Sequence, residues 1–171
     1  MFEIGDLIIY GNTGVCVVEK IGRPDFSGAC EDTDYYTLTP YYSSRSRIFT
    51  PCDNTKVVMR PVLSNDEATE ILENMDSIGF INVPDEKQRE SIYKETMKKC
   101  DCILFISILK TIKLRMEKRL SEGKKITAND EKYFNLAEDK LCGELAVALN
   151  KDKNDIRDFI LSKINGNVSV G

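Results

Sequence analysis

The sequence predicts an α+β protein in which a small, curled antiparallel β module is followed by an all-α bundle. Two observations lead to this fold class. The first 60 residues alternate short β-branched and aromatic runs with turns that contain glycine or proline, a pattern typical of short strands. After Pro61 the apolar residues recur at helical spacing, and signals for helix starts appear.

The β module is predicted to contain about five strands. Gly11-Asn12-Thr13-Gly14 separates the first two, and its glycines can adopt the positive φ angles that a hairpin loop needs. The fourth segment, Arg45–Thr50, alternates two sets of side chains and therefore has two different faces. The predicted strands cover residues 6–10, 15–21, 35–39, 45–50 and 56–60.

Helical patterns fill the rest of the chain. Ser64 and Glu67 have the spacing of a capping box and open a helix that reaches about residue 76. Further helices are expected at about 85–99, 102–120, 127–149 and 152–164. We therefore divide the chain into a β module (1–61), an acidic helix and junction (62–84), a helical domain (85–164) and a frayed tail (165–171).

Charge is distributed unevenly along the chain. The net charge is −4, yet residues 63–85 carry six acids and no base, whereas residues 86–125 carry twelve bases and six acids. Such a cationic face, with an aromatic side chain at Tyr93, is a plausible contact surface for backbone phosphates. Two other interpretations stay open: the lysines are simply solvated, or the acidic segment pairs with them inside the protein.

Several classes of function find no support in the sequence. The chain has no histidine, no phosphate-binding glycine loop and no paired cysteine motif, so we expect no enzyme, no cofactor and no metal site. The six cysteines are expected to be reduced thiols packed as small apolar residues. The longest apolar run has five residues, 102–106, so neither a membrane helix nor a signal peptide is expected.

The ordered motifs resemble the CarD family of bacterial transcription regulators, and the first half also resembles the polymerase-interacting domain of transcription-repair coupling factor. Coupling factor lacks the helical half, which here resembles the helical domain of the CarD family. The motifs that carry the resemblance are Phe2-x-Ile4-Gly5-Asp6-x-Ile8-Ile9-Tyr10, Gly14-Val15-x-Val17-Val18-x-x-Ile21, Pro51-x-Asp53-Asn54, Tyr93-Lys94, Thr127-x-x-Asp130-Glu131-Lys132 and Gly143-Glu144-Leu145-Ala146-Val147-Ala148.

The resemblance implies a Tudor-like β module that binds the RNA polymerase β subunit and a helical module that contacts promoter DNA without base-specific readout. It implies a cytoplasmic bacterial protein, associated with the nucleoid through polymerase, that modulates the stability of the open complex. We expect a monomer, although a domain-swapped dimer stays open. The alternative is a protein-binding scaffold, with polymerase or another protein as its partner, that makes no direct DNA contact.

Site residues follow from matched positions in the resemblance. The family's polymerase contact uses the strand before the Pro-x-Asp-Asn turn, so we expect strand addition there, although Ile48 or Phe49 could instead be core. Well-known members place a tryptophan where this chain has Arg89, which lacks the apolar area of a wedge. The polymerase-binding candidates are Arg23, Arg45, Arg47, Ile48 and Phe49; the DNA-binding candidates are Lys87, Arg89, Tyr93, Lys94, Lys98, Lys124 and Lys125.

Overall fold

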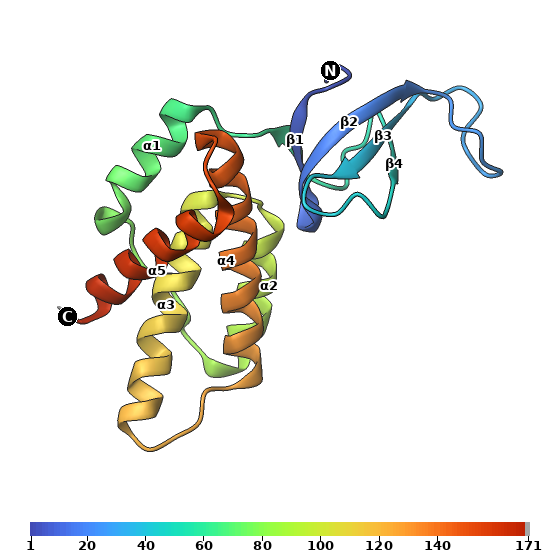
Figure 1. Cartoon of the computed structure of the whole chain (residues 1–171). Helices are drawn as coiled ribbons and strands as arrows, with labels where there is room; N and C mark the ends of the chain where they lie inside the picture. Colours follow the sequence, from blue (N-terminus) through green and yellow to red (C-terminus); the bar gives the residue numbers. More distant parts are fainter. Residues whose placement is uncertain (170–171) are drawn as a thin grey trace. The chain divides into compact units, whose positions relative to one another are not determined.

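The computed structural model describes residues 1–169 and forms two compact units, Met1–Val62 and the residues from Leu63 onward (Figure 1). Within the described residues, five antiparallel strands in the order β4-β3-β2-β1-β5 are followed by five helices, which confirms the predicted α+β class. The strands are β1 (Leu7–Tyr10), β2 (Gly14–Gly22), β3 (Tyr35–Pro40), β4 (Ile48–Pro51) and β5 (Met59–Pro61).

The loop between β1 and β2 forms as the glycines predict. A 3-10 turn, η1 (Gly11–Thr13), fills it, and Gly11 and Gly14 have φ angles of 45° and 86°. A Cβ atom on Gly11 would lie 2.6 Å from Cγ1 of Val57. Glycine is therefore required at Gly11 both by the backbone angle and by the close approach of a neighbouring side chain.

The two faces of the sheet have different surroundings. Val18 pairs with Leu38, and Leu38 pairs with Ile48, so these side chains share one face and build a small core with Tyr36 and Ile8. The intervening positions point to the opposite face. Strand pairing alone thus decides that Ile48 faces the core and that its neighbour in β4 faces outward.

The fourth and fifth strands are shorter than predicted. The Asn54 carboxamide accepts hydrogen bonds from the backbone N–H groups of Lys56 and Val57 at 3.0 and 3.3 Å and donates to the Val57 carbonyl at 2.8 Å. These backbone groups belong to a turn, so β5 starts only after them. The strand β4 begins at Ile48 rather than at Arg45, because the chain turns away directly after β3.

The helical unit begins with the predicted capping box. The Glu67 N–H donates to Oγ of Ser64 at 3.2 Å, and the Ser64 N–H donates to the Glu67 carboxylate at 2.8 Å. Two further 3-10 turns, η2 (Met75–Ser77) and η3 (Glu86–Gln88), interrupt the predicted helices. The helices are α1 (Asn65–Glu73), α2 (Arg89–Lys98), α3 (Cys102–Ser121), α4 (Ala128–Leu149) and α5 (Lys153–Ser169).

The longest helices, α3 and α4, run side by side and carry most of the core (Figure 1). Ile106, Leu109, Ile112, Leu141 and Leu145 are all fully buried between these helices and their neighbours. Burial of one such aliphatic side chain stabilises the fold by roughly 1.5–3 kcal/mol. The core therefore gives the candidate contact residues on α2 and on the α3–α4 loop a stable scaffold.

The last helix is longer than predicted. Asp152 caps it by accepting from the Asn154 and Asp155 N–H groups at 2.8 and 3.3 Å, as its position indicated. The backbone is helical to Ser169, beyond the predicted helix end at about residue 164, and Val170 and Gly171 lie outside the described residues. The frayed tail at 165–171 stays a prediction. No helix in the described part of the chain is long and apolar enough to cross a membrane.

Candidate functional site

One edge of the sheet is open for strand addition. The strand β4 pairs with β3 on one side, and no other strand of the described chain pairs with its second side. Its unpaired N–H and C=O groups can therefore accept an added strand. This is the strand on which the sequence placed four of the polymerase-binding candidates, although Arg45 and Arg47 lie just before it in the structure.

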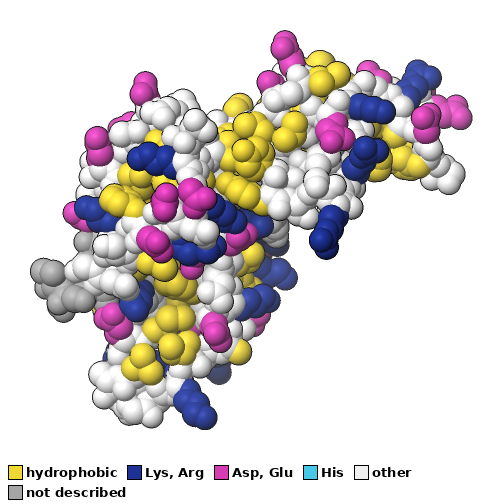
Figure 2. Space-filling view, viewed as in Figure 1, with side chains coloured by type: hydrophobic (Ala, Val, Ile, Leu, Met, Phe, Trp, Pro, Cys, Tyr) yellow, Lys and Arg dark blue, Asp and Glu magenta, His cyan; other side chains and the backbone are white. Residues whose placement is uncertain are grey.

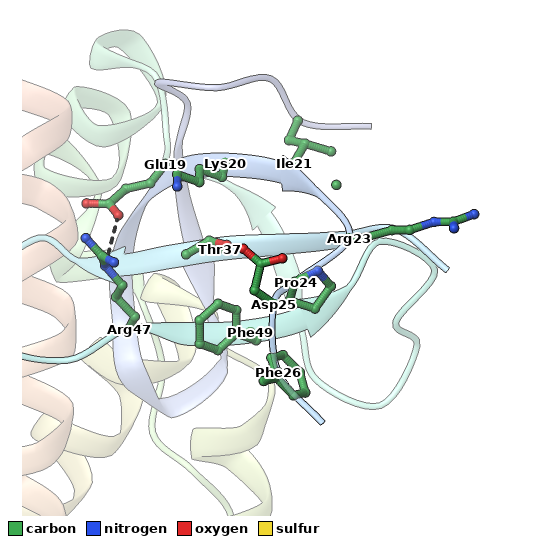
Figure 3. A pocket seen from close by; sticks show the side chains of 11 residues that line it. Glu19, Lys20, Ile21, Arg23, Pro24, Asp25, Phe26, Thr37, Arg47 and Phe49 are labelled. Carbon is green, nitrogen blue, oxygen red and sulfur yellow. Dashed lines mark ion pairs between the residues drawn. The ribbon is translucent and has the colours of Figure 1, made fainter. Parts of the chain in front are cut away.

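A pocket opens on the outer face of the sheet beside β4 (Figure 3). We call it the Arg47 pocket. Its volume is about 420 Å³, and β2, β3, β4 and the loop after β2 all contribute to it. The lining residues are Glu19, Lys20, Ile21, Gly22, Arg23, Pro24, Asp25, Phe26, Thr37, Arg47 and Phe49.

The structure brings three of the five polymerase-binding candidates to this pocket. Arg47 and Phe49 lie at its β4 side, and Arg23 lies at its far end with its guanidinium pointing away (Figure 3). Ile48 faces the sheet core and Arg45 is exposed outside the pocket. Of Ile48 and Phe49, the first is thus the core residue, and the second is exposed over 44% of its surface.

Arg47 already has a carboxylate partner in the free chain. Its Nε lies 3.5 Å from the Glu19 carboxylate, and both side chains are well exposed, at 65% and 37% (Figure 3). An ion pair of such exposure contributes only about 0–1 kcal/mol. A carboxylate on a partner can therefore replace Glu19 at little cost.

Phe26, which no sequence motif singled out, completes the apolar wall of the pocket. Its ring centroid lies 5.2 Å from that of Phe49 and 6.0 Å from that of Tyr35, so the loop after β2 folds back onto the outer face. Phe26 remains 43% exposed. A phenylalanine in an otherwise polar loop was the available signal, and it indicates a contact surface rather than a core position.

The basic candidates on the helical unit fall into two groups. Lys87, Lys94 and Lys98, at spacings of seven and four, follow one side of η3 and α2, and we call them the α2 lysine row. In Figure 2, Lys and Arg side chains gather along the edge of the helical unit where α2 lies. The second group is Lys124 and Lys125, both exposed in the α3–α4 loop.

These exposed lysines differ in their partners. Lys98 pairs with Glu95 at 2.9 Å and Lys124 pairs with Glu122 at 3.1 Å. Among the described residues, no ion pair holds Lys87, Lys94 or Lys125. These three lysines can therefore contact an external anion without first losing an internal partner.

Tyr93 does not belong to this surface. Its side chain is fully buried, its hydroxyl accepts from Nη1 of Arg89 at 2.8 Å, and it donates to Asp130 at 3.4 Å. Burial raises its pKa above the ordinary value for tyrosine. Tyr93 therefore joins α2 to the start of α4 in the free chain, and its DNA contact stays a prediction.

Arg89 is also engaged inside the protein. Its guanidinium donates two hydrogen bonds to Glu86, at 2.7 and 3.1 Å, and its side chain is only 16% exposed. Arg115 reaches the same Glu86 carboxylate at 2.6 Å and holds the buried Asp130 at 2.7 Å. Hydrogen bonds from Arg89 above all, and also from Arg115, lower the pKa of Glu86 to about 2. Arg89 is thus held by two partners and is not presented as a free side chain.

Lys110, which shares the basic stretch, is buried for a structural reason. Its ammonium group donates to the backbone carbonyls of Met75 and Ile78, at 2.5 and 2.7 Å, and so fixes the chain after α1 against α3. Desolvation lowers its pKa. The acidic segment is therefore tied to the basic stretch through these backbone carbonyls, and no ion pair of the described residues joins them.

The cysteines and acids do not assemble a metal centre. No group of three or more histidine, cysteine, aspartate or glutamate side chains that could hold a metal lies within the described residues. None of the six cysteines is joined to another in a disulfide within the described residues, and four of them, Cys16, Cys100, Cys102 and Cys142, are buried. Burial raises the pKa of Cys142 to about 12, so its thiol stays protonated at neutral pH.

Comparison with known proteins identifies the N-terminal unit. Residues 2–63 match the family described as the CarD-like/TRCF RID domain, and this match covers the sheet, β4 and the Arg47 pocket. No curated protein matches the chain. The chain therefore carries a CarD-like/TRCF RID domain, which suggests interaction with RNA polymerase, followed by a helical region, an arrangement consistent with the CarD family.

Proposed function

We propose that this protein is a non-enzymatic transcription regulator that binds the RNA polymerase β subunit through its RID domain. The observation that carries the proposal is the RID match together with the open β4 edge that it contains. An added strand gains main-chain hydrogen bonds along β4, and its side chains on the outer face reach the Arg47 pocket. The RID family is typically non-catalytic, although TRCF homologues are enzymes.

The proposed polymerase surface consists of Arg47, Phe49, Phe26 and Arg23. Arg47 and Arg23 supply positive charge at the two ends of the pocket, and the two phenylalanines supply an exposed aromatic wall between them. A partner strand with an acidic side chain near Arg47 and an apolar side chain near Phe49 fits this arrangement. Ile48 supports the surface from the core side, and Arg45 is a flanking cation.

The helical unit is proposed to contact promoter DNA through backbone phosphates. Lys87, Lys94 and Lys125 are exposed without ion-pair partners among the described residues, and Lys98 and Lys124 have only exposed ones. Two weak contacts on one chain raise each other's effective concentration, so a weak DNA contact is sufficient once polymerase is bound. On this basis we propose that the protein acts as a monomer in the bacterial cytoplasm and modulates the stability of the open complex.

A second candidate function is a polymerase-bound scaffold that does not touch DNA. It is favoured by the ion pair of Arg89 with Glu86, since Arg89 stands where well-known members carry a tryptophan, and by the burial of Tyr93. Neither residue offers an apolar wedge to the edge of a transcription bubble. DNA contact by lysines and stabilisation of the bubble are therefore separate questions for this chain.

A mobility-shift titration with forked promoter DNA, with and without polymerase, separates the two candidates. If the α2 lysine row contacts phosphates, Lys94→Glu weakens DNA binding and lowers the magnitude of the slope of log K against log salt by about 1. The matched control is Lys151→Glu, an exposed lysine at the end of α4 whose reversal changes the net charge equally. Equal binding by the two variants removes the proposed contact at Lys94, and absence of DNA binding by wild type, with and without polymerase, supports the scaffold.

A further inference from the structure

Two arginines of the helical unit converge on one carboxylate oxygen. Nη2 of Arg89, from α2, lies 2.7 Å from Oε1 of Glu86, and Nη1 of Arg115, from α3, lies 2.6 Å from the same atom. The shared carboxylate offsets the repulsion between the two positive charges that contact it. The pair of guanidiniums therefore forms a site for one anionic oxygen.

The two guanidiniums are fixed by buried groups rather than by Glu86 alone. Nε of Arg115 donates to Asp130 at 2.7 Å, and Asp130 is fully buried. Arg89 donates to the hydroxyl of Tyr93, which is also fully buried, and its guanidinium lies 5.8 Å from the centre of that ring. The side chains of Arg89 and Arg115 are only 16% and 20% exposed, so their buried partners Tyr93 and Asp130 hold both arginines in place.

Glu86 itself is held much less firmly. Its side chain is 62% exposed, and it belongs to η3, a short 3-10 turn directly before α2. Rotation about its side-chain bonds would move the carboxylate into solvent without moving the arginines. The site therefore combines preorganised cations with an exposed anion that can leave.

We propose that Arg89 and Arg115 form a binding site for a nucleic-acid backbone phosphate, and that the Glu86 carboxylate occupies this site until a phosphodiester displaces it. A phosphodiester matches the displaced group in charge and offers acceptor oxygens to the same guanidinium donors. The inference rests on the proposed function for the source of the phosphate, which is duplex DNA. It assigns Arg89 a phosphate contact in place of the wedge.

The charges around the site explain why it attracts a phosphate only after the Glu86 carboxylate has moved away. With Glu86 in place, two arginines face two carboxylates, Glu86 and the buried Asp130, so the cluster is neutral. When Glu86 leaves, the cluster gains one net positive charge beside Lys87. The α2 lysine row, which lies on η3 and α2, adds long-range attraction for the same phosphate backbone.

The direct test replaces Glu86→Gln, which keeps the size of the side chain and removes the competing charge. We expect the full-length variant to bind duplex DNA several-fold more tightly at low salt than wild type. The slope of log K against log salt should stay close to the wild-type slope, because wild type makes the same phosphate contact once Glu86 has left the site. The control is Glu131→Gln, an exposed acid in the first turn of α4, which should change neither quantity.

The double variant Glu86→Gln plus Arg89→Gln shows whether the gain belongs to this site. It should lose the additional affinity, with folding checked by circular dichroism. If Glu86→Gln binds DNA no better than Glu131→Gln, or if its gain persists without Arg89, Glu86 is a structural partner of the arginines and the proposal is overturned.

A measurement on the wild-type chain keeps the test independent of folding in the variants. Inorganic phosphate, titrated against chloride at equal ionic strength, should shift the Nε–Hε resonances of Arg89 and Arg115 saturably, whereas that of Arg157, paired with Glu138, should not move. Shifts that are absent, or equal for all three, overturn the site. Phosphate shifts together with unchanged DNA binding in Lys94→Glu would retain the site and remove the proposed contact at Lys94.

Discussion

Asp130 is the residue on which the polar cluster of the helical unit depends most. It is fully buried and accepts from Nε of Arg115 at 2.7 Å and from the Tyr93 hydroxyl at 3.4 Å. In Asp130→Ala, Arg115 keeps Glu86 and the Tyr93 oxygen still accepts from Arg89, but the Tyr93 O–H and the Arg115 Nε–H lose their acceptor. The loss is therefore dominated by one charge-assisted hydrogen bond, worth about 1.5–3 kcal/mol.

The small cavity left by the carboxyl group brings the expected destabilisation to about 2–4 kcal/mol. For a unit of this size, that corresponds to a fall in Tm of roughly 8–16 °C. Thermal unfolding of the full chain, followed by circular dichroism at a helix wavelength, measures it. The matched control is Asp158→Asn, an exposed acid on α5, which should stay within about 0.5 kcal/mol of wild type. If the free energy of unfolding of Asp130→Ala lies within about 1 kcal/mol of that of the control, the cluster does not hold the helices together.

Two further predictions concern the turn in the RID domain and the response to acid. Gly11→Ala places a Cβ atom 2.6 Å from Cγ1 of Val57 at a φ angle of 45°. It should therefore lower the free energy of unfolding of the β unit, measured in urea, by about 1–3 kcal/mol. The comparison is Gly28→Ala, which has a positive φ angle but no atom within 4 Å of the added Cβ. Because the folded-state pKa of Glu86 is depressed from 4.5 to about 2, its contribution to stability is present above pH 4.5 and is lost as pH falls toward 2. Acid unfolding of Glu86→Gln should therefore lack that part of the pH dependence, and an unchanged acid transition would contradict the pairing of Glu86 with the two arginines.

The parts of the fold that depend on local signals were predictable from the sequence. The capping box of Ser64 and Glu67 and the glycines of the first hairpin depend on residues close in the chain, and both form as expected. Strand ends were less predictable, because the side chain of Asn54 withdraws two backbone groups from the ladder. A helical pattern also gave no warning of η2 and η3, where backbone carbonyls and carboxylates bond to distant side chains.

The candidate sites show the same limit. Sequence position placed Arg47 and Phe49 beside an open strand, but only the fold shows that Phe26 packs against Phe49 and that Glu19 already pairs with Arg47. Spacing along a helix put Tyr93 near Lys94, yet spacing alone cannot tell which of two neighbouring residues is buried. That distinction depends on Asp130, thirty-seven positions away, to which the Tyr93 hydroxyl donates.

The affinity of the full-length chain for the RNA polymerase β subunit tests the central claim most directly. Wild type, Arg47→Glu and the control Lys56→Glu, an exposed lysine in the turn before β5 whose reversal changes the charge equally, are compared by biolayer interferometry. The account predicts that wild type and Lys56→Glu bind alike, and that Arg47→Glu binds at least about tenfold more weakly, a loss of about 1.4 kcal/mol. Absence of binding by wild type, or equal binding by all three proteins, would contradict it.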